Sequence, residues 1–246
     1  MSLAQELVKE GHKIFRWRSY LPLVLLTLLF PAFRHFTFPC GSHRLNEFWG
    51  IFCLCVSLFG LTIRVYTIGH VPRKTSGRNT QKQVAEELNT TGIYSVVRHP
   101  LYLGNFWIWI GISLYPRHWW LTLLVAVISL VYHERIILAE EAFLESKFAD
   151  QFRNWSARTP AFLPNFKNWT PSDLPFCWRT ALQREYLGLY AIIVIFTAME
   201  AAGHFMTNGR FFPDKPWLFL FIGATVLFVA VRFLRKCTRF LKVVGR

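Results

Sequence analysis

Apolar residues in this chain gather in long runs separated by polar, basic stretches. The runs cover residues 19–33, 47–69, 101–115, 119–131, 186–205 and 217–234. A helix of about 20 apolar residues crosses a bilayer, and these runs reach or approach that length. The pattern predicts an all-α, polytopic membrane helix bundle with about six transmembrane helices.

Local signals refine the expected helices. Pro22 suits the first turn of the first span, and Pro31 should bend or end that span. The basic lead of residues 1–18 is long and no small-residue cleavage site follows, so we expect an uncleaved span rather than a signal peptide. The fourth helix should continue beyond the membrane as far as Phe148.

Composition supports a membrane protein. Of 246 residues, 53% are hydrophobic, and the formal net charge is +14. A protein this apolar and basic is expected to meet anionic lipid rather than nucleic acid. The five cysteines are odd in number and include no Cys-x-x-Cys pair, so they indicate neither a disulfide framework nor a metal site. The sequence gives no indication of an oligomeric state.

Lysine and arginine assign the sides of the membrane. They number four before residue 19, five in 71–98, seven in 132–185 and six from residue 232 on, while each segment on the opposite side holds at most two. Cytoplasmic segments carry this excess. We therefore expect both termini and the two long connections in the cytoplasm.

The stretch Arg98-His99-Pro100-x-Tyr102-x-Gly104 opens the third span. Proline is favoured in the first turn of a helix, so Arg98 and His99 should lie at the membrane surface, with Tyr102 one turn inside. Such a helix N-terminus favours anions. The alternative interpretation is a basic and aromatic anchor at the lipid headgroups.

Adjacent acids, Glu140 and Glu141, stand on the expected continuation of the fourth helix. A tight turn at 116–118 makes the third and fourth spans an antiparallel hairpin, about 22 Å up and back. This geometry predicts that the acids return to the level of Arg98 and His99. A solvated helix face is the alternative. In the fifth span, Glu200 should face the bundle or lie near a membrane interface, with His204 one turn on as its nearest candidate partner.

These residues carry a resemblance to a known family. Gly92-x-Tyr94-x-x-x-Arg98-His99-Pro100-x-Tyr102-x-Gly104, then Glu140-Glu141, then Arg158-Thr159-Pro160-x-x-Leu163-Pro164 resembles the isoprenylcysteine carboxyl methyltransferases, which group with the membrane phospholipid methyltransferases. The similarity covers a methyltransferase-like core at 60–166 within a single domain of residues 1–246. Residues 186–235 form an additional C-terminal pair of spans that the resemblance does not explain.

The resemblance implies S-adenosylmethionine as cofactor. It assigns His99, Pro100, Tyr102, Gly104, Glu140 and Glu141 to a cytoplasmic cofactor pocket, and it makes Arg98 and Arg135 candidates for binding the acceptor's anionic group. Independently, no two glycines stand two apart in the chain, so the glycine-rich loop of soluble dinucleotide-binding proteins is missing from the sequence.

The methyl acceptor stays open at this point. An anionic acceptor needs a cationic clamp, and Arg64, Arg73, Lys74, Arg78, Arg98 and Arg135 favour one. The family has similar bacterial members that methylate a phosphate of lipid A. This resemblance makes a lipid phosphate the favoured acceptor and a bacterial inner membrane the expected location. The alternatives are a prenylcysteine carboxylate and a phospholipid amine. Two other classes remain: an NADPH-dependent sterol-reductase-like enzyme and a non-catalytic lipid-binding protein.

Overall fold

The fold is described from a computed structural model, which covers residues 3–17, 20–34, 36–72, 85–241, 243 and 245. Within these residues the chain is helical, and its one β-type pairing is an isolated bridge between Gly92 and Thr170. The α-helices are α1 (Leu3–Trp17), α2 (Leu21–Thr27), α3 (Leu29–Phe33), α4 (His43–His70), α5 (Pro100–Leu114), α6 (Trp119–Ser156), α7 (Trp178–Asn208) and α8 (Lys215–Cys237). Short 3-10 turns cover Pro39–Gly41, Ile93–Ser95 and Phe166–Asn168. The all-α prediction is confirmed.

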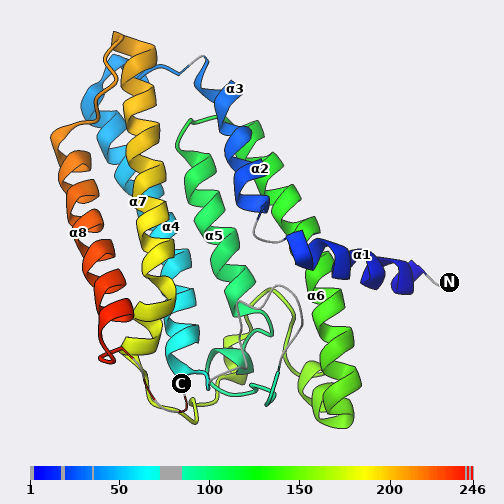
Figure 1. The fold of residues 1–246 in the computed structure, drawn as a ribbon. Coiled ribbons are helices and arrows are strands. Elements are labelled where there is room, and N and C mark those ends of the chain that lie inside the picture. The colour runs from blue at the N-terminus through cyan, green and yellow to red at the C-terminus, as the bar shows by residue number, and fades with distance from the viewer. Residues whose placement is uncertain are drawn as a thin grey trace.

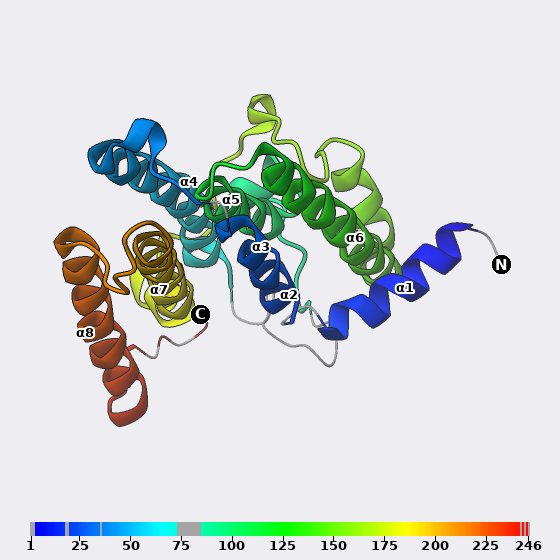
Figure 2. The ribbon, with the colours of Figure 1, turned by 90° about the horizontal axis from the view of Figure 1, so that it is seen from above.

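The long helices stand side by side in the order α8, α7, α4, α5 and α6 (Figure 1). Seen from above, α2 and α3 pack in front of α5 and α6 (Figure 2). The main core joins Phe33 of α3, Cys53 of α4, Ile112 of α5, Val125 of α6 and Phe196 of α7. One core therefore connects the helices of the predicted methyltransferase-like region with α7.

Four helices are long and apolar enough to cross a membrane: α4, α6, α7 and α8. Two predicted spans are shorter. The helix α5 has 15 residues, about 22 Å of rise. The first span is divided into α2 and α3 at Leu28, because Pro31 has no N–H to bond the carbonyl one turn earlier. Pro22 stands in the first turn of α2, as predicted.

Many large apolar side chains on these helices have no protein neighbour to cover them. Phe219 and Val226 on α8, Phe59 on α4 and Val127 on α6 are about half exposed or more. In a soluble protein such a surface would aggregate, whereas hydrocarbon chains solvate it. Together with the length of the helices, this surface makes the chain an integral membrane protein.

The helix α6 continues well past the membrane, as expected. It remains α-helical to Phe148, and a kink at Ala149, with φ of 40°, redirects its last turns up to Ser156. The predicted end of the regular helix at Phe148 is confirmed. The added turns bring Trp155 and Ser156 back towards the start of α5.

The first helix was not predicted. The segment α1 lies across α6, nearly perpendicular to the spans (Figure 1). It approaches so closely that a Cβ on Gly11 would lie 2.1 Å from the carbonyl oxygen of Arg135. A basic, amphipathic helix in this orientation is typical of one that lies in the membrane interface.

The described parts of the connections from α4 to α5 and from α6 to α7, together with the C-terminal end of α8, lie at the lower end of the bundle in Figure 1. The sequence assigns these lysine- and arginine-rich segments to one side of the membrane, and the fold gathers the described parts of them at one end. Three cations that we had associated with the acceptor, Arg73, Lys74 and Arg78, lie outside the described residues.

Candidate active site

The loop before α5 is shaped by a glycine turn and by buried side chains. Gly92 begins it with φ of 61° and ψ of −133°, a conformation that glycine adopts without strain. The side chains of Val96 and Val97 are then buried to 1% exposure or less. His99 follows as the N-cap residue of α5, and Pro100 is the first residue of that helix, as predicted.

The end of α6 and the segment after it hold this loop in place. Trp155 Nε1 donates a hydrogen bond to the carbonyl of Tyr94 at 3.0 Å. The backbone N–H of Arg98 donates to the carbonyl of Pro160 at 2.9 Å, and the N–H of Asn165 donates to the carbonyl of Val96 at 2.9 Å. The two motifs around residues 92–104 and 158–164 therefore form one unit, although some sixty residues separate them.

At this unit the acids of α6 meet the start of α5. Glu141 Oε1 lies 2.9 Å from His99 Nε2 and 2.9 Å from Arg98 Nε. Tyr102 donates its hydroxyl proton to Glu140 Oε1 at 2.6 Å, and Glu140 Oε2 lies 3.6 Å from His99 Nδ1. We call Arg98, His99, Tyr102, Glu140 and Glu141 the acid–imidazole cluster. The predicted convergence of the two stretches is thus observed.

The electrostatics of the cluster follow from these contacts. His99 is 6% exposed. Burial by itself lowers the pKa of this imidazole, but the hydrogen bonds and negative charges of Glu140 and Glu141 outweigh burial and raise the pKa above its ordinary value. The carboxylates stand beside the N-terminus of α5, where the helix dipole favours negative charge. The chain's own acids thus occupy the anion-binding position that the sequence suggested.

Two predicted site residues lie elsewhere. Gly104 faces α4, where a Cβ would come within 2.7 Å of the carbonyl oxygen of Gly60, because it points to the other side of α5 from Tyr102. Arg135 lies on the side of α6 that α1 covers, with Nε 4.0 Å from Glu10. The structure therefore does not join Gly104 or Arg135 to the acid–imidazole cluster.

Two features were missed by sequence reasoning. Arg64, counted there among cations free to bind an acceptor, forms a bidentate ion pair with Glu185 at 2.8 and 2.6 Å and donates to Asn105 at 2.7 Å. His133 is 3% exposed beside the cluster, its ring centroid 5.1 Å from that of Tyr102, and its Nδ1 has no hydrogen-bond partner in the described part of the chain. The available signals were Glu185, an acid directly before the fifth span, and His133, which stands seven residues before Glu140.

Known proteins show related sequences. Residues 46–151 match the sequence model of the phospholipid methyltransferase family, a stretch that runs from α4 to the kink in α6. The protein-S-isoprenylcysteine O-methyltransferase of Schizosaccharomyces pombe is 36% identical over 78 residues, which are 31% of this chain and 33% of that protein. Residues 46–151, which match the family model, contain the acid–imidazole cluster. The core at residues 46–151 therefore belongs to the isoprenylcysteine and phospholipid methyltransferase-like family.

Other relatives match the chain over a longer stretch. A cobalt-zinc-cadmium resistance protein of Cupriavidus metallidurans is 28% identical over 200 residues, 78% of this chain and 85% of that protein. A nickel-cobalt-cadmium resistance protein of Alcaligenes xylosoxydans is 26% identical over 199 residues, 78% of this chain and 85% of that protein. No solved structure matches the chain significantly.

Proposed function

We propose that this methyltransferase uses S-adenosylmethionine to methylate an anionic group of a membrane lipid, with a lipid A phosphate as the favoured acceptor. The observation that supports this most is the acid–imidazole cluster. It joins two stretches that the family resemblance assigns to the cofactor, and it stands at the end of the bundle where the long basic connections meet.

The residues present suit this cofactor. S-adenosylmethionine offers a sulfonium and an ammonium cation, ribose hydroxyls and a carboxylate, and when bound it supplies an electrophilic methyl group. The side chains of Glu140 and Glu141 are 25% and 19% exposed, so their carboxylates can accept from hydroxyls or bind a cation. The unpartnered Nδ1 of His133 is a further polar atom beside them. We assign these acids, with His99, Pro100 and Tyr102, to cofactor binding.

For the acceptor we propose Arg98 as the binding group. Its guanidinium contacts Glu141 through Nε and donates from Nη1 to the carbonyl of Ser156 at 2.9 Å, so it lies at the boundary of the cluster. A phosphate or carboxylate is already a nucleophile at neutral pH and needs positioning rather than a base. Because Arg135 is paired with α1 and Arg64 with Glu185, we give Arg135 a lesser role and Arg64 none.

The relatives bear on the choice of acceptor. Two have names that associate them with resistance to divalent metal ions. Methylation of a phosphate monoester removes one negative charge and one metal-binding oxygen from the cell envelope. We propose that this loss of charge serves metal tolerance here, which favours an anionic lipid acceptor over an amine. The carboxylate of a prenylated cysteine remains the second candidate, since the yeast enzymes are named for it.

Calorimetric titration of the purified protein with S-adenosylmethionine tests the cofactor assignment. Replacing His99 or Glu140 with Ala should weaken binding at least tenfold, the equivalent of about 1.4 kcal/mol. The matched control is Glu145→Ala, which removes an exposed acid from the same helix. Affinity that is unchanged in folded His99→Ala and Glu140→Ala proteins would contradict the assignment.

Transfer of a labelled methyl group to intact lipid A, dephosphorylated lipid A and a farnesylated cysteine peptide tests the acceptor. We expect label in intact lipid A alone, and we expect Arg98→Gln to raise KM for the acceptor more than for the cofactor. Label in the peptide would establish the carboxylate alternative.

Reporter fusions test the membrane topology that this function requires. Fusions after residues 165 and 246 should report the cytoplasm. An outside signal would place the cluster on the opposite side of the membrane from cytoplasmic S-adenosylmethionine.

A further inference from the structure

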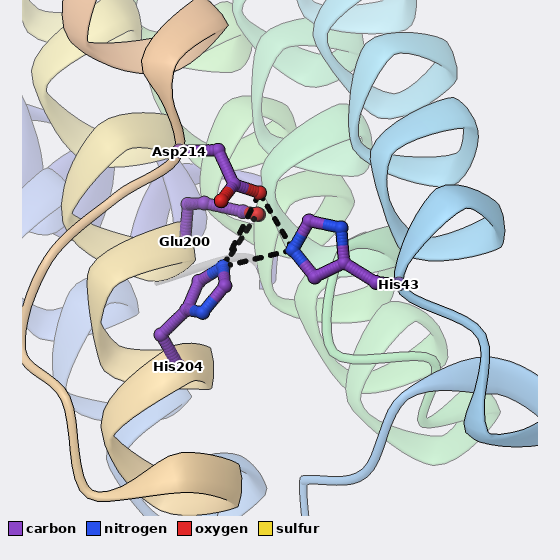
Figure 3. A group of neighbouring side chains, drawn as sticks. All are labelled: His43, Glu200, His204 and Asp214. Atoms are coloured by element: carbon purple, nitrogen blue, oxygen red, sulfur yellow. Dashed lines mark hydrogen bonds and ion pairs between the residues drawn. The ribbon is translucent and has the colours of Figure 1, made fainter.

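A second group of chemically active side chains lies at the other end of the bundle. His43 is the first residue of α4, Glu200 and His204 stand one turn apart on α7, and Asp214 is the N-cap residue of α8. Figure 3 shows the four side chains pointing into a common space. One ligand atom from each lies within 4.8 Å of all the others. We infer that His43, Glu200, His204 and Asp214 form a binding site for a divalent transition-metal ion such as Zn²⁺.

The distances fit a tetrahedral site. Zn–N bonds of about 2.0–2.1 Å and Zn–O bonds of about 2.0–2.2 Å place neighbouring ligand atoms about 3.3–3.6 Å apart. His204 Nε2 lies 3.2 Å from His43 Nε2, 3.4 Å from Glu200 Oε1 and 3.3 Å from Asp214 Oδ2. The separation of 2.6 Å between His43 Nε2 and Asp214 Oδ2 is shorter, the length of a hydrogen-bonded ion pair, and must lengthen slightly around an ion.

Glu200 provides an independent indication of a ligand. Its side chain is fully buried, yet Oε1 accepts no hydrogen bond in the described part of the chain. The other oxygen, Oε2, accepts from the Tyr115 hydroxyl and from Asn46 Nδ2, whose own Oδ1 is held by Arg117. One oxygen is therefore fixed by surrounding residues while the second points towards the two histidines, which is how metal-binding carboxylates are oriented.

The charges of the site also favour a dication. Two carboxylates and two neutral imidazoles around a divalent ion sum to zero, which lowers the cost of keeping Glu200 charged inside a membrane span. Two imidazoles with two carboxylates are a donor set that suits Zn²⁺. Phe38 packs edge-on against both rings, with centroids 5.3 and 5.6 Å away, and limits their rotation.

We assign the ion a structural role. All four positions of a tetrahedral ion would be filled by protein, which is typical of structural rather than catalytic zinc. The ligands join the α7–α8 hairpin to the start of α4, at the opposite end of the bundle from the acid–imidazole cluster (Figure 1). His43 and Asp214 are partly exposed, at 38% and 26%, so an ion can enter from the surface.

The sequence did not suggest this site. Glu200 and His204 were predicted partners, and their separation of 3.4 Å confirms that pairing. Residues 43 and 214, however, have no local signal that links them to α7, and the sequence prediction included no metal ligands.

Zn²⁺ titration of the full chain in detergent, after removal of metal with a chelator, tests the site. We expect one Zn²⁺ per chain and a visible spectrum of tetrahedral Co²⁺ when cobalt replaces zinc. Loss of a group that only hydrogen-bonds to a metal ligand weakens metal binding by roughly 10–100-fold. Loss of a ligand itself should cost at least as much, so we expect Zn²⁺ binding to weaken by this factor or more in His43→Gln, Asp214→Asn and His204→Asn. His118→Gln is the matched control, since that histidine is the N-cap residue of α6 and contacts the carbonyl of Ala32.

Failure to bind Zn²⁺ in the wild-type chain, or binding in the ligand variants equal to that of His118→Gln, would overturn the inference and leave ordinary ion pairs between the histidines and acids. If His204→Asn does not fold, the two partly exposed positions decide the outcome. The titration requires no methyl donor, so its result is independent of the proposed methyl transfer.

Discussion

Replacing Arg64 with Met should lower the free energy of unfolding of this methyltransferase by about 3–5 kcal/mol, the usual cost of removing one partner of a buried ion pair. The Arg64 side chain is 18% exposed and that of Glu185 only 4%. The substitution removes two hydrogen bonds to Glu185 and one to Asn105 and leaves the carboxylate buried without its cation. It also breaks the ionic connection between α4 and α7.

Reversible unfolding in mixed micelles with increasing sodium dodecyl sulfate, followed by tryptophan fluorescence, measures this loss. Arg153→Met is the control, because Arg153 is 65% exposed and pairs with Glu145, which is 47% exposed. Such surface pairs contribute little to stability because water screens their charges. The double variant Arg64→Met with Glu185→Leu should recover much of the loss. Our account would be refuted if Arg64→Met cost no more than Arg153→Met, or if the double variant were as unstable as the two single losses added together.

Three further predictions concern the site and its support. Because the pKa of His99 is raised in the folded protein, the contribution of His99 to stability should be complete below its ordinary pKa of about 6.5 and be lost as the pH rises through the raised value. Thermal melts across pH should show this loss in the wild type and not in His99→Gln. Trp155→Phe should cost about 1–3 kcal/mol by leaving the carbonyl of Tyr94 without its donor, and a melting temperature equal to that of the wild type would argue against this bond. Gly60→Ala should destabilise by about 1–3 kcal/mol, since its Cβ would lie 2.4 Å from the Gly104 carbonyl, whereas Gly223→Ala, with nothing within 4 Å, should not.

Much of the acid–imidazole cluster could be predicted from the sequence because the hairpin is local. A turn of a few residues at 116–118 makes α5 and α6 antiparallel neighbours, and the rise of a helix then fixes the level to which Glu140 and Glu141 return. The rotation of α6 about its axis was not fixed in this way. Only the structure pairs Glu141 with His99 and Arg98 and leaves Tyr102 to Glu140.

What the sequence determined by itself was the helical membrane class, the positions of the long helices and the proximity of motifs joined by a short turn. The tertiary structure decided the contacts between helices distant in the chain: Arg64 with Glu185, Gly104 with Gly60, and His43 with Asp214. The physical reason is that lipid and bundle interior are both apolar, so the apolar pattern does not say which face of a spanning helix is buried. Side-chain packing and the pairing of a few charges settle the order and rotation of the helices, and these depend on the whole chain.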